Sequence, residues 1–259
     1  MTTHRDTILD QFTRQAVPFA TAPGIKDEAS LSLVLDFSGV GPSDTVLDVA
    51  CGPGILACGF ARIAAHVTGI DITPAMLERA RLLQAERGLT NVTWDQGDVL
   101  PLPYPDASFT IVASRYAFHH FLDPRAVLAE MKRVCAPGGT VLVIDAAPAR
   151  DKADAFNAME LVRDPSHVRA MPEEELLHMF IRAGLPIPRV TGYRLEAEME
   201  GLISRSFPKP GADETLRRIF RDSLANDDLG MGARKVGDTI HFGYPVAVLA
   251  ARRKCASST

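Results

Sequence analysis

The sequence predicts an α/β fold: a doubly wound, mostly parallel sheet of seven strands with helices on both faces. Short apolar, β-branched runs recur between residues 46 and 145, as expected for strands that are buried on both faces of a sheet. Helical patterns separate these runs, and strands that alternate with helices form parallel sheets with right-handed crossovers. With 259 residues, of which 46% are hydrophobic, the chain is long enough for one such domain.

Two helices are predicted before the first strand. Apolar residues at helical spacing cover residues 1–22, interrupted by Pro18, and a second helical pattern covers residues 29–37. Packing on the edge of the sheet is the simplest role for this segment.

The first strand, Val46 to Val49, is followed by a glycine turn and by helical spacing over residues 55–65. Gly52 and Gly54 let the backbone approach a ligand closely, which a Cβ would prevent. The turn fits the dinucleotide fingerprint G-x-G-x-x-A. Asp48 precedes the glycines, however, and its carboxylate would repel a pyrophosphate, so a cationic ligand fits better.

Acidic residues end the second and third predicted strands, residues 67–71 and 92–98. At the tip of the second strand, the carboxylate of Asp71 can accept two hydrogen bonds from a ribose diol. Thr73 and Pro74 predict the capped start of the next helix. Asp71 therefore predicts an adenosine-containing ligand without choosing between cofactors of that kind.

Residues 110–114 and 140–145 predict the fourth and fifth strands. The helix between them begins at Asp123 and closes at a Pro-Gly-Gly turn. The segment Arg115 to Phe121, RYAFHHF, directly follows the fourth strand. It is therefore expected at the carboxyl edge of the sheet, where open α/β sheets bind ligands.

The remaining chain predicts helices at 152–162 and 173–183 and two further strands at 189–195 and 239–251. These two strands complete the seven-stranded sheet. Between them, residues 198–238 mix apolar and charged positions, which predicts a helical insert.

Four motifs in this order resemble those of class I S-adenosylmethionine-dependent methyltransferases, and most closely the quinone-biosynthesis C-methyltransferase-like group. They are VLDVACGPG, the acidic tip at Asp71, the pair Asp98 and Val99, and the turns LPLPYPDASF and RVCAPGG around the fourth strand. The resemblance implies a Rossmann-like fold, S-adenosylmethionine as the cofactor and methyl transfer as the reaction. It implies cofactor contacts from Asp48, Ala50, Gly52, Pro53, Gly54, Asp71, Ile72, Met76, Asp98, Val99 and Ser114.

The resemblance also suggests how a single domain of residues 1–259 is divided. We expect an N-terminal helical lid at 1–40, a cofactor-binding core at 41–147, and an acceptor-side half at 148–259 that carries the insert at 198–238. Plain packing of the first segment on the sheet edge is an equal alternative to the lid.

Methyl transfer requires alignment of the acceptor, the methyl group and the sulfur, and it requires a base only when the acceptor must lose a proton. We predict His119 as the base and His120 as a second catalytic candidate, since imidazole exchanges protons near neutral pH. The alternative is structural, with one ring packed under the lid and the other bonded to a loop carbonyl. Residues expected to orient the acceptor are Arg115, Tyr116, Phe19, Arg163 and His167.

Two of those residues, Arg163 and His167, lie in the segment RDPSH, whose simpler explanation is a helix-ending turn held by salt bridges. The predicted function is methylation of an oxygen, carbon or nitrogen atom of a small apolar or amphipathic molecule. One alternative is an NAD(P)-dependent oxidoreductase, which the glycine fingerprint and Asp71 support but which lacks an evident Tyr-x-x-x-Lys pair. The other is a non-catalytic S-adenosylmethionine-binding protein.

Composition argues against other partners. The net charge of −4 provides no clustered basic face for a nucleic acid. The N-terminus has no signal-peptide pattern and no apolar run is long enough to span a bilayer, so we expect a cytoplasmic protein without a membrane partner. The four cysteines lack metal-binding spacing, and we expect no metal. The oligomeric state stays open, with a homodimer compatible with the sequence.

Overall fold

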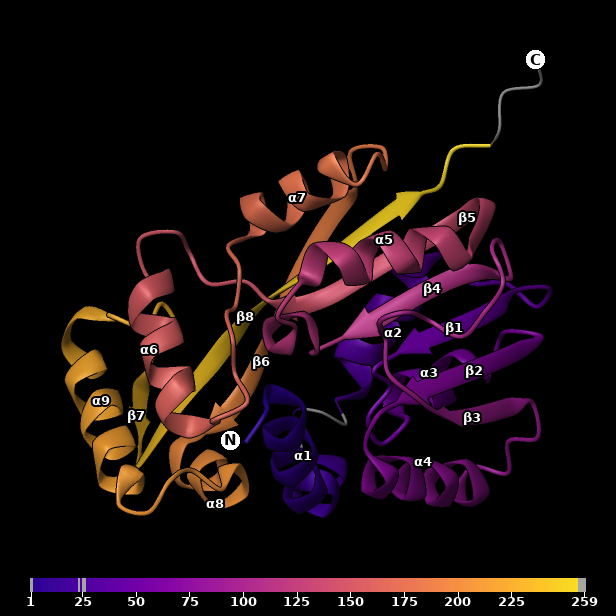
Figure 1. The fold of residues 1–259 in the computed structure, drawn as a ribbon. Coiled ribbons are helices and arrows are strands. Elements are labelled where there is room, and N and C mark those ends of the chain that lie inside the picture. Colours follow the sequence, from indigo (N-terminus) through magenta and orange to yellow (C-terminus); the bar gives the residue numbers. More distant parts are fainter. Residues whose placement is uncertain (1, 23, 25–26, 256–259) are drawn as a thin grey trace.

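The computed structural model describes residues 2–22, 24 and 27–255 (Figure 1). Residues 1, 23, 25 and 26 of the expected lid, and residues 256–259 of the expected acceptor-side half, lie outside this description.

The first five strands form the parallel part of the sheet, as predicted. From one edge inward they are ordered β3-β2-β1-β4-β5. The order reverses between β1 and β4, and this switch point opens a crevice at the carboxyl ends of the strands. The five strands are β1 (Thr45–Val49), β2 (His66–Asp71), β3 (Val92–Gln96), β4 (Phe109–Arg115) and β5 (Cys135–Ala146).

The last part of the chain adds antiparallel strands. β8 (Thr239–Arg252) lies between β5 and β6 (Arg189–Glu198) and runs antiparallel to both, so the two late strands are confirmed. The prediction of seven strands was one short, because β7 (Arg234–Val236) pairs with β8 inside the expected helical insert. Gly237 has a φ of 60°, which lets the chain reverse in a two-residue turn.

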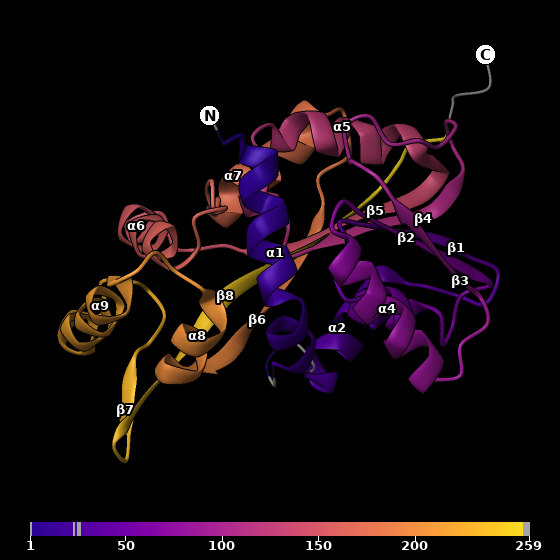
Figure 2. The same ribbon diagram turned by 60° about the horizontal axis from the view of Figure 1, so that its bottom comes forward.

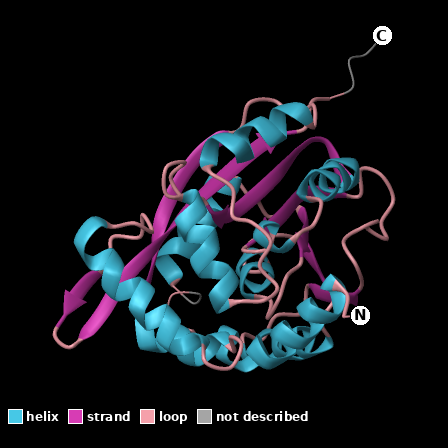
Figure 3. Ribbon diagram, turned by 60° about the vertical axis from the view of Figure 1, so that its left-hand side comes forward, coloured by secondary structure: helices cyan, strands magenta, loops and turns pink. Residues whose placement is uncertain are grey.

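Helices cover both faces of the sheet, which confirms the doubly wound arrangement (Figure 3). On one face α2 (Glu28–Ser38) and α3 (Ile55–Phe60) pack against the strands, and on the other face α5 (Pro124–Val134) and α7 (Glu173–Arg182) do so. α4 (Pro74–Glu86) contacts β2 and β3.

A third apolar core lies beyond the parallel strands. α6 (Ala153–Arg163), α8 (Met199–Ser206) and α9 (Ala212–Asn226) pack around the first half of β8. α1 (His4–Thr21) crosses between this group and α4 and contacts both α4 and α8 (Figure 2). Pro18 does not interrupt α1 as predicted, because it lies in the last turn, where a missing N–H removes one hydrogen bond.

Three local boundaries also differ from the prediction. α3 ends at Phe60 rather than near residue 65, where the backbone N–H of Ala65 instead donates to Asp44. Thr73 precedes α4, but its side chain makes no capping hydrogen bond. β5 begins at Cys135, directly after α5, so the Pro-Gly-Gly segment belongs to the strand. Within the described residues, no helix has the length and apolar character required to cross a membrane.

Candidate active site

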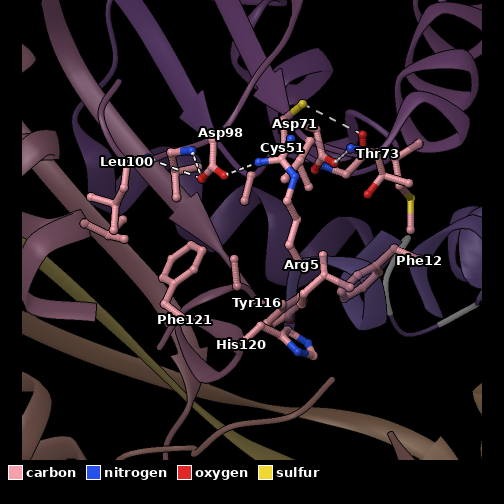
Figure 4. A pocket seen from close by; sticks show the side chains of 18 of the residues that line it. Arg5, Phe12, Cys51, Asp71, Thr73, Asp98, Leu100, Tyr116, His120 and Phe121 are labelled. Carbon is pink, nitrogen blue, oxygen red and sulfur yellow. Dashed lines mark hydrogen bonds and ion pairs between the residues drawn. The ribbon is translucent and has the colours of Figure 1, made fainter. Parts of the chain in front are cut away.

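A cavity of about 330 Å³ lies at the carboxyl ends of β1, β2 and β4, against α1. We call it the first cavity. Figure 4 shows Asp71 and Asp98 at the strand ends, with Arg5 and Phe12 of α1 across from them. Predicted cofactor-binding residues in its lining are Ala50, Gly52, Pro53, Asp71, Ile72, Met76, Asp98 and Val99.

The two glycines of the loop after β1 have different roles. Both have positive φ values, 52° for Gly52 and 76° for Gly54, where a Cβ is strained. A Cβ on Gly52 would meet no atom within 4 Å, so this glycine borders open space. A Cβ on Gly54 would lie 2.5 Å from the Trp94 side chain and 2.8 Å from Cβ of Ala80. Gly54 is therefore required for packing and does not line the cavity.

Asp71 fixes the glycine loop to the start of α4. One carboxylate oxygen accepts from the backbone N–H of Gly52 and the other from that of Thr73, each at 2.8 Å. Burial raises the pKa of Asp71, against these hydrogen bonds. Because each oxygen has a second lone pair, the carboxylate can still accept hydrogen bonds from a ligand in the cavity.

Asp48 lies behind the loop, next to a small pocket of about 30 Å³ that Arg115 and Tyr116 also line. It is 1% exposed, and neither carboxylate oxygen has a hydrogen-bond partner in the described chain. Burial raises its pKa to about 7, although the nearby backbone N–H of Ala57, which is not in hydrogen-bond geometry, and the charge of Arg115 work in the opposite direction. Ser114 is buried within β4 and does not line the cavity, and its hydroxyl oxygen also lacks a partner among the described residues.

Helix α1 is fastened over the first cavity by two polar contacts. Arg5 Nη1 donates to Asp98 Oδ2 at 2.7 Å, and His4 Nε2 donates to the carbonyl oxygen of His120 at 2.8 Å. Asp98 also accepts from the backbone N–H of Val99 at 2.7 Å. The first turn of α1 therefore bridges the ends of β3 and β4.

A second cavity, of about 150 Å³, adjoins the first. It lies among α1, α6 and α8, and it contains the predicted residues His119, Arg163 and His167. Four side chains line both cavities, and two of them come from α1. These shared residues are Phe12, Phe19, Tyr116 and His120.

His119 is bound to Asp145, a partner that the sequence did not reveal. His119 Nδ1 lies 2.5 Å from Asp145 Oδ1, at the end of the adjacent strand β5. Burial favours the neutral ring, but the negative charge and hydrogen bond of Asp145 outweigh it, so the pKa of His119 is raised. The sequence feature that could have indicated this partner is Asp145 itself, the acidic residue that ends the fifth predicted strand.

The contacts of His120 are those expected if its role is structural and not catalytic. Its Nδ1 donates to the backbone carbonyl of Ser166 at 3.0 Å, and its ring packs edge-on against Phe12. Burial, followed by the positive charge of His119, lowers the pKa of His120 to about 3. The ring is thus neutral near pH 7 and contributes mainly a surface to both cavities.

The other predicted acceptor-side residues belong to polar networks. Arg163 pairs with Glu160 at 2.5 Å, and Glu160 also accepts from the hydroxyl of Tyr244 at 2.8 Å. Glu160 and Tyr244, neither of which the sequence singled out as a site residue, also line the second cavity. The Tyr116 hydroxyl lies 2.5 Å from that of Tyr193.

Arg115 ends β4 beside the first cavity, and Tyr116 directly follows it. The guanidinium carbon of Arg115 lies 4.6 Å from the centroid of the Tyr116 ring, and Nη2 donates to the tyrosine hydroxyl at 3.4 Å. Tyr116 has a φ of 57°, a conformation that non-glycine residues adopt mainly where surrounding structure imposes it.

Comparison with known proteins places this chain among methyltransferases. A family model described as a methyltransferase domain matches residues 47–143. The uncharacterized methyltransferase YcgJ of Bacillus subtilis is 32% identical over 196 residues, which cover 75% of this chain and 78% of YcgJ. The ubiquinone/menaquinone biosynthesis C-methyltransferase UbiE of Teredinibacter turnerae is 37% identical over 115 residues, 43% of this chain and 46% of that protein.

Solved structures agree with this placement. The crystal structure of YcgJ from Bacillus subtilis has a TM-score of 0.77 and 26% identity, and the match covers 88% of this chain and 99% of that one. A putative methyltransferase from Bacillus halodurans has a TM-score of 0.79 and 26% identity, with coverage of 87% and 99%.

Proposed function

Because this chain belongs to the class I S-adenosylmethionine-dependent methyltransferases, we propose that it methylates an oxygen, carbon or nitrogen atom of a small apolar or amphipathic molecule. The observation that carries the proposal is the second cavity, which adjoins the first, has mixed apolar and ionisable walls and contains His119. Because the chain belongs to this family, the alternative of an NAD(P)-dependent oxidoreductase is no longer needed. A non-catalytic cofactor-binding protein is the alternative that the experiment below tests.

Two observations support the fit of the cofactor to the first cavity. Gly52 leaves open space beside the loop. Asp48 does not line the first cavity but the small pocket behind the loop, where its buried carboxylate lacks a hydrogen-bond partner by geometry in the described chain, which suits an ammonium group. When bound, S-adenosylmethionine supplies an activated methyl group on a sulfonium centre. We assign Asp48 to the ammonium group, Asp71 to the ribose, and Asp98 with Val99 to the adenine.

On the acceptor side, His119 is the base. Its Nδ1–H is bonded to Asp145, so Nε2 is the nitrogen that takes up a proton. Arg115 and Tyr116 orient the acceptor from the end of β4, while Phe19 of α1 lines both cavities and helps to exclude water. Arg163 and His167 contact the acceptor from the opposite wall.

Mass spectrometry tests the proposal directly. The protein is incubated with S-adenosylmethionine and a panel of phenols, quinols, carboxylic acids and amines, and both S-adenosylhomocysteine and the methylated product are followed. Product from one acceptor class supports the proposal. Cofactor binding without any methylated member would favour the non-catalytic alternative instead.

The base assignment has its own variant. His119→Ala is expected to lower turnover by about 100-fold or more, the usual contribution of a general base, while the dissociation constant for S-adenosylhomocysteine stays unchanged. His178→Ala, at an exposed position of α7, is the matched control. Unchanged turnover in the His119 variant would contradict the assignment.

A further inference from the structure

The hydrogen bonds of Asn157 determine which nitrogen of His167 carries the proton. Asn157 Nδ2 donates to the carbonyl oxygens of Ala153 and Ala170, at 2.8 and 3.0 Å, and Asn157 Oδ1 accepts from the backbone N–H of Ala170 at 2.7 Å. The amide oxygen therefore faces His167, whose Nε2 lies 2.7 Å away. Since an oxygen can only accept here, Nε2 carries the proton and Nδ1 is an acceptor.

This acceptor nitrogen is unsatisfied, and it belongs to a ring that lines the second cavity. His167 lines the cavity and is 4% exposed, and its Nδ1 has no hydrogen-bond partner in the described chain. Burial, followed by the positive charge of His119, lowers the pKa of His167 to about 4, so the ring is neutral near pH 7. A buried acceptor without a donor costs free energy, which a ligand that donates a hydrogen bond recovers.

A second acceptor nitrogen lies beside it. The ring centroids of His119 and His167 are 5.5 Å apart, and both rings line the same cavity. When its ring is neutral, His119 uses Nδ1–H to bind Asp145, which leaves Nε2 as its acceptor. Because Asp145 raises the pKa of His119, this neutral form is favoured at higher pH. Two neighbouring imidazole rings, each with one acceptor nitrogen when neutral, therefore line the second cavity.

The surrounding charges disfavour an anionic ligand. Three buried carboxylates, Asp145, Glu160 and Asp164, lie around these rings with the largely buried cation Arg163, and His119 adds a second positive charge when it is protonated. At the cavity wall, Glu196 and Arg205 are exposed or partly exposed and have opposite charges. An uncharged hydroxyl group fits this balance better than a carboxylate does.

We propose that the acceptor is an apolar ring compound with two adjacent hydroxyl groups, one bound to His119 Nε2 and the other to His167 Nδ1. Phe12, Phe19, Phe156 and Leu202 supply apolar walls for the ring. The hydroxyl at His119 loses its proton to Nε2, its oxygen forms the new bond to the methyl group as the sulfur–methyl bond breaks, and the proton later leaves to water. No oxidant or reductant is needed. The inference rests on the proposed function and names its acceptor class.

The test compares three probes: 4-methylcatechol, its one-donor analogue 2-methoxy-4-methylphenol, and 4-methylphenol. Calorimetry on protein saturated with S-adenosylhomocysteine gives binding, and mass spectrometry gives methyl transfer. We expect the diol to bind at least tenfold more tightly than either one-donor probe, because only the diol satisfies both acceptors.

Two substitutions of His167 test the roles of its two ring nitrogens separately. In His167→Gln the amide nitrogen lies as many bonds from Cα as Nε2, so the bond to Asn157 is kept, while the acceptor at the position of Nδ1 is lost because the amide oxygen lies one bond further from Cα. In His167→Asn the amide oxygen takes the place of Nδ1, so the acceptor is kept and the bond to Asn157 is lost. We expect the glutamine variant to lose the preference for the diol and the asparagine variant to retain part of it, with thermal unfolding used to confirm that each is folded.

The outcomes of the two proposals are distinct. Equal binding of the diol and the one-donor probes by the wild-type protein, with methyl transfer still dependent on His119, would overturn the inference and leave the proposed function intact. A diol preference that survives in His167→Gln would also overturn it. If no member of the wider panel is methylated, the proposed function fails, and the inference fails with it.

Discussion

The buried carboxyl group of Asp48 connects cofactor binding to pH. Burial raises its pKa to about 7 in the free protein, whereas an ammonium group beside it favours the ionised form. The ligand therefore binds best above pH 7, and its affinity is expected to fall as the pH drops below 7, by up to about tenfold per pH unit. Calorimetry with S-adenosylhomocysteine across this range measures the effect.

Asp48→Asn is expected to flatten that dependence and to weaken binding at high pH. Asp36→Asn, on the exposed side of α2, controls for the loss of one negative charge. An affinity that does not vary with pH in the wild-type protein would show that Asp48 does not face the ammonium group.

Some site residues could be predicted because their position depends on one strand alone. Asp71 ends β2 and Asp98 lies two residues after β3, and the carboxyl ends of parallel strands share one edge. Asp145 could not be paired with His119 in advance, since that contact depends on β5 lying beside β4. Glu160 and Tyr244 are 84 positions apart, and only the folded chain brings them together.

At the level of elements, the turn between β1 and α3 contains two glycines whose substitution by alanine is expected to affect stability differently. Gly54→Ala places a methyl group 2.5 Å from Trp94 at a positive φ, and we expect it to lower the free energy of unfolding by more than about 2 kcal/mol. Gly52→Ala meets no neighbour and is expected to cost only about 1 kcal/mol, from backbone strain. Chemical denaturation without ligand compares the two, and equal losses would contradict the packing role of Gly54.

The contact between Arg5 and Asp98 is expected to hold the first turn of α1 in place, and this can be tested. Arg5 and Asp98 have side chains that are 58% and 45% exposed, so Arg5→Ala is expected to change the free energy of unfolding by less than about 1 kcal/mol. Hydrogen exchange in the first turn of α1 should nevertheless become faster. Arg14→Ala removes a pair with Asp10 within the same helix and serves as control. Equal exchange in both variants would mean that Arg5 does not hold α1 in place.

The elements that the sequence predicted best are those buried on both faces. β1, β2, β4 and the inner part of β5 are buried along nearly their whole length and are rich in apolar residues, so their pattern indicates strands. The three residues of β7 are all exposed, and nothing in their composition separates a short strand from a loop. The matches to YcgJ and its crystal structure confirm the family resemblance that the motifs indicated.

At the scale of the whole molecule, the two cavities share the walls that α1 provides. Because Phe12, Phe19, Tyr116 and His120 line both cavities, we expect ligands to bind cooperatively. S-adenosylhomocysteine should tighten the binding of 4-methylcatechol by about fivefold or more, and the diol should tighten cofactor binding by the same factor. Calorimetry in both orders measures this. Independent binding would show that α1 does not couple the sites, and Phe12→Ala should weaken the coupling.

The position of β8 also constrains how the chain can be assembled. This strand is the last of the sequence, yet it lies inside the sheet, and in the described chain β6 pairs with β8 alone. While the protein is being synthesised, β5 keeps an open edge and β6 has no neighbour until residues 239–252 have left the ribosome. Open edges of this kind are prone to pair with other chains. A C-terminal truncation before β8 would therefore expose an aggregation-prone intermediate rather than a smaller enzyme.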